Sequence, residues 1–271
     1  MLDSKKPWNL EHSLMVMEEF GKFHAISFAL NDQDPELFKY LTRNMTPLQF
    51  EYHHVLNLEA YCIGVILESN MKLLKESGRL DLYDKFDKLH SEVYDTINYV
   101  VDVEDKRTIC HGDCWNNNFM FKYQDENDNQ KPTNVKFLDF QLAICHSPVV
   151  DLVFNIYSTG DDVTLQNFDL LLETYYKSLS NCIESLGSDP STLFTYDELR
   201  RHWRKYGLFG ILMTYTALRL SHFTAEEAPD FIEISEGKKD FMECLTSKGK
   251  YEEQCKQRLL NVFTHFGDTF L

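Results

Sequence analysis

Four polar residues near the middle of the 271-residue chain have types and a spacing that can carry chemistry. They are His111, Asp113 and Asn118 in the run "ICHGDCWNNNF", and Asp139 near the end of the apolar run "NVKFLDF". Asparagine and aspartate prefer turns and caps, where their side chains bond the nearby backbone. The first run is therefore a poor strand and a poor helix, and we expect a polar loop there.

The segment between Asn118 and Asp139 predicts two short strands that position these side chains. Residues 118–124 alternate in character, residues 134–140 suit a second strand, and "DENDNQKPTN" between them is polar and rich in turn formers. If the strands pair as a hairpin, Asn118 and Asp139 lie at the same end of it. The loop with Asp113 leads into that end, so three oxygen-bearing side chains converge.

Such a set suits the transfer of a phosphoryl group from a nucleotide. Mg²⁺ on the β- and γ-phosphates takes oxygen ligands in octahedral geometry and keeps several waters. An aspartate and an asparagine supply enough ligand, and a second aspartate can orient an acceptor hydroxyl and take its proton. The alternative interpretation is a polar loop capped by Asp113 and Asn118, with Asp139 capping a helix or turn.

The rest of the chain is typical of helices, so the expected fold class is α+β, mostly helical, with a short β-hairpin at the active site. Helical or amphipathic patterns cover residues 10–30, 50–77, 80–100, 167–187, 199–220 and 251–271. We expect a turn at "RTIC", before the polar loop, and an acidic loop at 224–237. We interpret His24, on the first helix, as a packed and hydrogen-bonded histidine and not as a ligand.

Composition narrows the class of protein. The net charge of −16 disfavours nucleic acid and anionic membranes as partners. No apolar run is long enough to span a membrane, and the first residues lack the apolar region of a secretion signal. Seven cysteines form no C-x-x-C pair, which favours free thiols over a structural zinc site. We expect a cytoplasmic protein, and the sequence leaves its oligomeric state open.

Two longer motifs carry a resemblance to a known family. "CHGDCWNNNFMFKY" followed by "VKFLDFQLAICHSPVVDL" resembles the ecdysteroid kinase-like family, also described as CHK kinase-like, a choline- and aminoglycoside-kinase branch of the protein-kinase-like superfamily. Its members share an H-G-D-x-W-x-N-N core and D-F-Q where protein kinases have D-F-G. The tail with Ser147, Pro148, Asp151 and Leu152 also matches, and "GKFHAISFAL" and "KYGLFGILMTYTALRL" resemble its helical segments.

The resemblance implies a role for each matching residue. Asp113 is expected to be the catalytic base, with His111 bracing the catalytic loop. Asn118 and Asp139 are expected to hold Mg²⁺ and, through it, ATP. The structural supports are expected to be Asp151, which anchors the loop from the following helix, and Trp115 and Gln141, which match the pattern and are best read as packing residues. The implied cofactors are Mg²⁺ and ATP, and the implied acceptor is a small-molecule alcohol, possible examples being steroid-like hydroxyl compounds.

One part of the family pattern is not visible in the sequence. Kinases of this kind carry an upstream lobe with a glycine-containing loop and a strand lysine paired with a helix glutamate. Here Gly21, Gly64 and Gly78 are scattered, and no lysine-bearing strand precedes His111. We therefore expect residues 1–271 to form a single domain equivalent to the large lobe, without the nucleotide-binding small lobe. An incomplete coding sequence, a short isoform and a non-catalytic remnant all explain this.

Three function classes remain open on the sequence. The first is an ATP-dependent phosphotransferase acting on a small alcohol. The second is a kinase-derived binding module that has kept the fold without the reaction. The third is a metal-dependent hydrolase using Asp113, Asp139 and nearby histidines, although the chain has no clustered ligand motif such as H-E-x-x-H.

Overall fold

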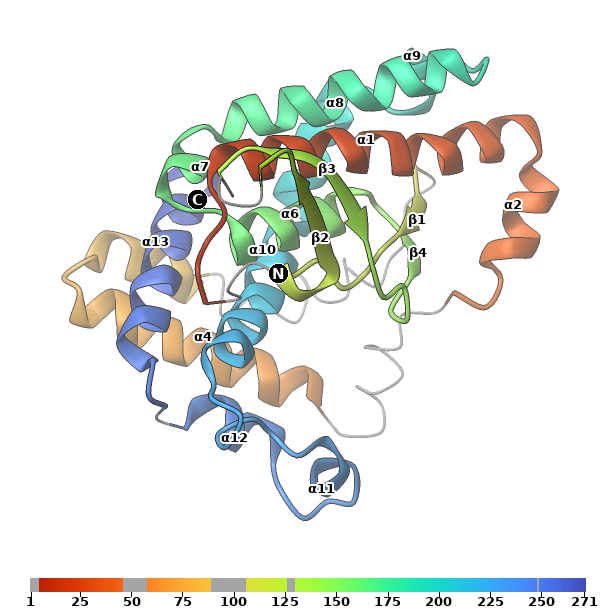
Figure 1. Cartoon of the computed structure of the whole chain (residues 1–271). Helices are drawn as coiled ribbons and strands as arrows, with labels where there is room; N and C mark the ends of the chain where they lie inside the picture. Colours follow the sequence, from red (N-terminus) through yellow and green to blue (C-terminus); the bar gives the residue numbers. More distant parts are fainter. Residues whose placement is uncertain (1–4, 46–57, 89–105, 126–129, 248) are drawn as a thin grey trace.

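Long helices dominate the computed structural model, which describes residues 5–45, 58–88, 106–125, 130–247 and 249–271 (Figure 1). The long helices are α1 (Leu10–Gln33), α4 (Leu58–Glu76), α8 (Phe168–Ser185), α10 (Tyr196–His222) and α13 (Glu252–Phe270). Shorter ones are α2 (Pro35–Thr42), α6 (Val149–Thr159), α7 (Asp162–Gln166), α9 (Pro190–Leu193), α11 (Phe231–Ser235) and α12 (Phe241–Thr246), and residues 80–88 are also helical. No described helix combines the length and the apolar character needed to cross a membrane.

The strands form two small antiparallel pairs. In the hairpin, β2 (Phe119–Tyr123) pairs with β3 (Pro132–Phe137), and Phe119 lies opposite Phe137. In the second pair, β1 (Thr108–Cys110) lies against β4 (Ile144–His146). A single-turn 3-10 helix, η1 (Asn116–Asn118), joins the polar loop to β2. The predicted mostly helical α+β fold is therefore confirmed.

The predicted elements differ from the structure in a few places. The helices over 10–30, 167–187, 199–220 and 251–271 are confirmed within a few residues, whereas 50–57 and 89–100 lie outside the described residues. The second hairpin strand begins at Pro132 and ends at Phe137, because the backbone turns before Asp139. The turn expected at "RTIC" was wrong, since Thr108–Cys110 is strand β1. Three residues are too few for an alternating pattern to be seen. The acidic loop contains the short helix α11.

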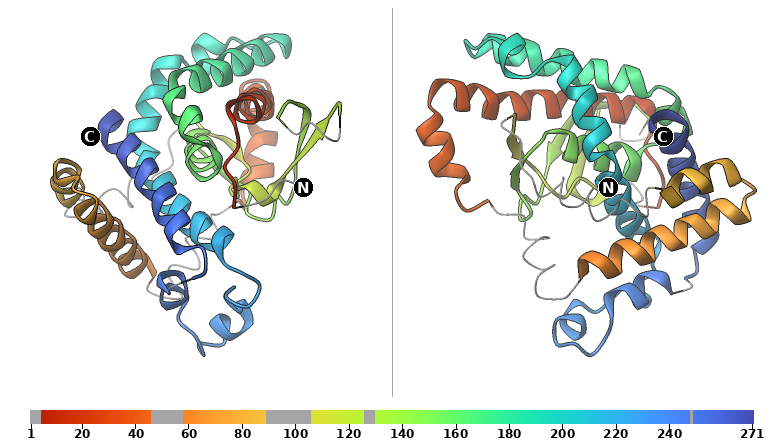
Figure 2. Two further views of the ribbon diagram at one scale, coloured as in Figure 1. Left: turned by 60° about the vertical axis from the view of Figure 1, so that its left-hand side comes forward. Right: turned by 180° about the vertical axis from the view of Figure 1, so that it is seen from behind.

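Helix α6 lies at the centre of the fold and all eleven of its residues are buried. The hairpin lies on one side of it and α10 on the other, as the front and rear views show (Figures 1 and 2). Gly210 of α10 allows very close packing, because a Cβ built there would lie 2.2 Å from Cγ1 of Val153. Helices α1 and α8 run side by side above the hairpin (Figure 1). Gly21 of α1 allows this close packing, because a Cβ built there would lie 2.6 Å from Cβ of Ser178 on α8. The site residues thus rest on tightly packed helices.

Candidate active site

The loop between β1 and η1 makes a sharp turn at Gly112. Its φ is +80°, a left-handed conformation that L side chains rarely adopt. A Cβ built on Gly112 would lie 1.9 Å from the carbonyl oxygen of Leu142, so no side chain fits there. The glycine of the H-G-D run is therefore required by the backbone of this loop.

Asp151 of α6 anchors the loop through its backbone. The carboxylate accepts hydrogen bonds from the backbone N–H groups of His111 (2.6 Å) and Gly112 (2.9 Å), and it lies 3.2 Å from Nε2 of His24. Burial alone raises the pKa of Asp151, but the hydrogen bond from His24, the charge of His24 and the hydrogen bond from the Gly112 N–H outweigh it. The pKa of Asp151 is consequently lowered, and the anchor is a charged carboxylate. Asp151 thus contacts the backbone of the loop from α6.

The ring of His111 ties the loop to the end of the hairpin. Nδ1 accepts a hydrogen bond from the backbone N–H of Asp113 (3.2 Å), and Nε2 lies 2.8 Å from the carbonyl oxygen of Leu138. A carbonyl oxygen only accepts, so the hydrogen of the neutral ring must be on Nε2. The buried ring also packs against Phe119 and Phe140. His111 therefore fixes Asp113 relative to the residue before Asp139.

Asp113 and Asn118 are joined directly. Nδ2 of Asn118 donates to Oδ2 of Asp113 (2.8 Å) and to its backbone carbonyl (2.9 Å). Burial raises the pKa of Asp113 and the nearby charge of Asp139 raises it further, while the hydrogen bond from Asn118 opposes the change. The net shift is upward, which makes this carboxylate a better proton acceptor than an exposed aspartate. Trp115, expected to pack, is half-buried and packs against the hydrophobic core next to this pair.

Asp139 lies at the same end of the hairpin as Asn118. The backbone N–H of Leu138 donates to the carbonyl of Asn118 (2.9 Å), directly beyond the Phe119–Phe137 pair. Asp139 is the one described non-glycine residue with positive φ, at +62°, and its side chain is exposed. A non-glycine residue in this region is uncommon and occurs preferentially at functional sites. Two residues further on, Gln141 is exposed on a turn.

The side chains at this end of the hairpin fit a hard divalent cation. Asn118 uses its amide nitrogen to bond Asp113, which leaves Oδ1 as the atom that can bind a cation. Asp139 supplies an exposed carboxylate at the same end of the hairpin, near enough for its charge to raise the pKa of Asp113. Amide and carboxylate oxygens are the ligands that Mg²⁺ takes in nucleotide sites, usually one or two per protein. Asn118 and Asp139 are thus the residues that would hold Mg²⁺.

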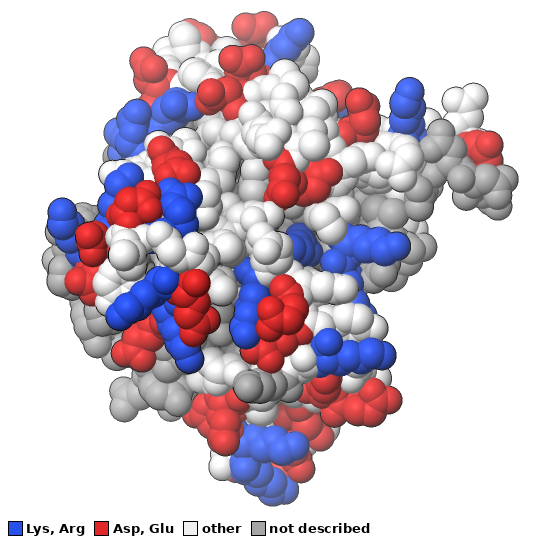
Figure 3. Space-filling model, turned by 90° about the vertical axis from the view of Figure 1, so that its left-hand side faces the viewer, with Lys and Arg blue, Asp and Glu red and all other residues white. Residues whose placement is uncertain are grey.

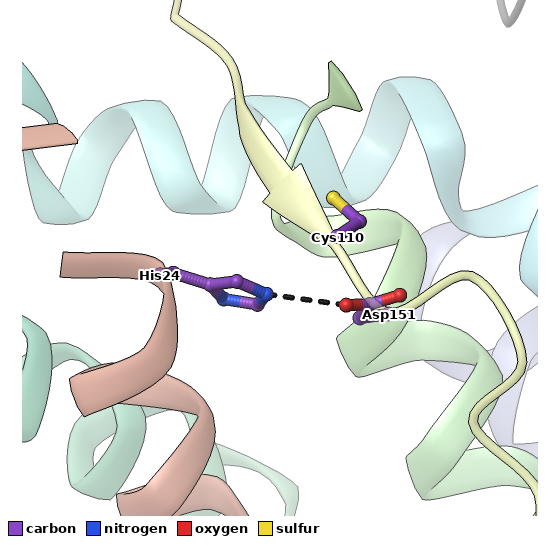
Figure 4. Close-up of side chains that lie close together, drawn as sticks. All are labelled: His24, Cys110 and Asp151. Atoms are coloured by element: carbon purple, nitrogen blue, oxygen red, sulfur yellow. Dashed lines mark hydrogen bonds and ion pairs between the residues drawn. The ribbon is translucent and has the colours of Figure 1, made fainter. Parts of the chain in front are cut away.

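A second group of possible ligands lies behind the loop. Figure 4 shows His24 of α1 directed at Asp151 of α6, with the thiol of Cys110 beside them, and one possible ligand atom of each lies within 4.8 Å of the others. Burial and the charge of Asp151 raise the pKa of Cys110 well above its ordinary value, so the sulfur keeps its proton. The thiol donates to the carbonyl of Ser147 (3.3 Å). Each of the three groups already has a hydrogen-bond partner within the fold, so we interpret them as a hydrogen-bonded core cluster.

The six cysteines whose side chains the structure describes, Cys110 among them, are all free thiols. His24 is fully buried between Tyr175, whose hydroxyl lies 3.1 Å from Nδ1, and Asp151. It is a packed and hydrogen-bonded histidine, as predicted, and its hydrogen bond supports the loop anchor. The sequence offered no signal for that contact, because His24 and Asp151 are 127 residues apart.

Asn155 is a contact of the loop that the sequence analysis missed. It lies on α6, four residues after Asp151, and its Nδ2 donates to the carbonyl of Cys114 (3.0 Å). The available signal was the i, i+4 spacing of two polar residues within an apolar helix, since such residues share one face. In the run "SPVVDLVFNIY" this spacing is easily passed over among the apolar residues.

Fold and site together are consistent with the kinase-like class of proteins, in which an H-G-D loop and a hairpin carry the polar residues of the site. A family model gives the more specific assignment. The model of the ecdysteroid kinase-like family matches residues 1–188, more than half of the chain, and the chain therefore belongs to this family. The match includes every candidate site residue and ends before α10. Among curated proteins, none matches the chain.

Proposed function

We propose that this chain acts as an ATP-dependent phosphotransferase on a small-molecule alcohol. Membership of the ecdysteroid kinase-like family supports kinase-like phosphoryl transfer as the general activity. The observation that carries the proposal is the cluster at the end of the hairpin. There Asn118 bonds Asp113, and Asp139 lies near enough for its charge to raise the pKa of Asp113. This supplies a base and two metal ligands in one place.

In the proposed reaction Asp113 receives the proton of the acceptor hydroxyl. The acceptor oxygen forms a bond to the γ-phosphorus as the bond between that phosphorus and the oxygen of ADP breaks, and the proton moves to the carboxylate of Asp113. Bound Mg²⁺ would neutralise charge on the phosphates, held by Asn118 and Asp139. Asn118 also orients Asp113, because its Nδ2 occupies one carboxylate oxygen and leaves the other for the proton. His111 and Asp151 hold the loop in register.

The family name supports a steroid-like alcohol as the acceptor. The described residues before β1 are almost wholly helical, in α1, α2, α4 and residues 80–88. This supports the assignment of residues 1–271 to a single kinase-like domain equivalent to the large lobe.

The alternative function is a binding module without turnover. The binding and turnover experiment described next distinguishes the two functions.

The test is Mg²⁺-ATP binding and turnover with hydroxylated steroids and choline-like alcohols. We expect Asp139→Ala to weaken nucleotide binding at least about tenfold by removing a metal ligand. Asp113→Asn should leave binding nearly unchanged and lower kcat by about 10²–10⁴-fold, the usual contribution of a general base. Calorimetry measures the first effect and phosphorylated product measures the second.

The matched control is Asp84→Ala, an exposed aspartate on the helix formed by residues 80–88. It removes the same charge away from the site and should change neither quantity. Full turnover in Asp113→Asn would contradict the role of Asp113. Nucleotide binding by the unaltered chain without turnover on any alcohol would favour the binding module.

A further inference from the structure

The polar loop is held by helix α6 at two points, on either side of Asp113. On one side the carboxylate of Asp151 accepts from the backbone of His111 and Gly112. On the other side Nδ2 of Asn155 donates to the carbonyl of Cys114, the residue that follows Asp113. Asp151 and Asn155 are both fully buried.

The two side chains match the groups that they bind. A carboxylate only accepts hydrogen bonds, and it faces two N–H donors, whereas an amide nitrogen only donates, and it faces a carbonyl. An aspartate at position 155 could not make this hydrogen bond, because its carboxylate would face the carbonyl oxygen of Cys114. Cys114 is itself fully buried, so its carbonyl would have little access to water if the amide were removed.

The amide oxygen of the Asn155 side chain shows that packing alone does not explain why an asparagine occupies this position. Its Oδ1 is buried and has no hydrogen-bond partner among the described residues. An unpaired buried acceptor is unfavourable, and an apolar side chain of similar volume would avoid it. The favourable contact that Asn155 makes through its side chain is the one to Cys114. The contact with the loop therefore explains the asparagine at this position.

We propose that Asn155 is a positioning residue for Asp113, acting through the Cys114 carbonyl. With Asp151 it fixes the loop on both sides of the base. The platform itself is rigid, since Gly210 of α10 packs directly on Val153, midway between the two side chains on α6. The inference rests on the phosphotransferase proposed above, in which the placement of Asp113 sets the rate.

The test compares Asn155→Leu with Asn70→Leu as a matched control. Asn70 of α4 is also buried (2% exposed), its Nδ2 also donates to a carbonyl, that of Ile66 in its own helix, and its Oδ1 also lacks a described partner. We expect Asn155→Leu to lower kcat by about 10- to 100-fold with KM for ATP little changed, because small misplacements of a reacting group have effects of this size. Asn70→Leu should leave kcat unchanged. The melting temperature of each variant shows whether it is folded.

A second readout does not depend on activity. Hydrogen exchange of the amides of residues 111–114 should be at least about tenfold faster in Asn155→Leu than in the unaltered chain, and unchanged in Asn70→Leu. If the unaltered chain has no turnover, the phosphotransferase fails, and faster exchange still supports the loop contact. Unchanged exchange in folded Asn155→Leu overturns the inference, as does a fall in kcat that Asn70→Leu reproduces. Faster exchange with full kcat also overturns it, because the loop would then move without affecting the reaction.

Discussion

At the scale of single residues, the environment of Asp113 depends on backbone conformation as much as on side chains. Gly112 turns the chain so that the N–H groups of His111 and Gly112 face Asp151, while Asp113 faces Asn118. Asp139 adopts a left-handed conformation as well, at φ +62°. The site therefore has one residue with a left-handed backbone conformation on each side of the cluster, Gly112 before Asp113 and Asp139 after Asn118.

Gly112→Ala should disrupt the loop, because the substitution has two sources of destabilisation. A non-glycine residue at this φ costs about 1–3 kcal/mol, and the new Cβ would overlap the Leu142 carbonyl, which cannot rotate away. We expect a loss of stability above about 3 kcal/mol, or a displaced loop with little turnover. Urea unfolding and the kinase assay measure these effects.

Gly78→Ala separates the two sources. Gly78 has nearly the same φ, +79°, but a Cβ there would meet nothing within 4 Å. We expect a loss of about 1 kcal/mol from the backbone alone. Equal losses at both glycines would show that the overlap with Leu142 is relieved without consequence.

At the scale of elements, α6 links the core to the loop. Every residue of α6 is buried, and its contact with α10 is as close as the absence of a side chain at Gly210 allows. A helix held in this way has little freedom to shift along its axis. Asp151 and Asn155 therefore present their polar groups to the loop from a fixed position.

Gly210→Ala should strain this contact. The added methyl group would lie 2.2 Å from Val153, and overpacking of this kind typically costs about 1–3 kcal/mol, more than the gain of about 1 kcal/mol in helix propensity. Val153→Ala removes the opposing methyl groups. The double variant should be more stable than the two single losses predict, with a coupling of about 1 kcal/mol or more. Additive losses in urea unfolding would contradict direct contact as the cause.

At the scale of the whole molecule, the net charge is −16, yet acidic and basic groups are interspersed on the face drawn in Figure 3. Three buried or half-buried histidines favour the neutral form. Burial lowers the pKa of His12 from 6.5 to about 4, and burial also lowers the pKa of His222 and His265. His12 joins α1 to the hairpin, since its ring bonds Asn9 and the hydroxyl of Tyr123.

These histidines predict a loss of stability in mild acid. Each binds protons more weakly in the folded chain than in the unfolded chain, so its contribution is complete above pH 6.5 and decreases as the pH falls. For His12 the decrease runs from pH 6.5 to about 4. Urea midpoints at pH 7.5, 6.0 and 5.0 should fall in that order.

The variant His12→Gln isolates one contribution to that trend. Glutamine does not titrate, so the variant should lose less stability between pH 7.5 and 5.0 than the unaltered chain, whatever its stability at pH 7.5. Parallel pH curves for the two proteins would show that His12 has no part in the effect.

The sequence by itself determined the elements and the chemical character of the site. Apolar periodicity identified α1, α8, α10 and α13, because a buried helix face repeats over many turns. The spacing of His111, Asp113, Asn118 and Asp139 identified the candidate cluster, since a hairpin brings its two ends together whatever the rest of the fold. The resemblance to the ecdysteroid kinase-like family followed from the same residues and was confirmed by the family match.

The tertiary structure alone showed which distant residues support that cluster, beyond the bracing by His111 and the anchoring by Asp151 that the resemblance implied. The pair β1–β4 joins residues 34 to 38 positions apart, from Cys110 with Ile144 to Thr108 with His146, through strands too short to show a pattern. The contacts of Asp151 with His24, and of Asn155 with Cys114, cross long stretches of chain and depend on how α6 lies against α1 and the loop. Local sequence patterns report which face of an element is buried. Which polar groups meet within that buried region depends on the packing of distant elements, and only the folded chain specifies it.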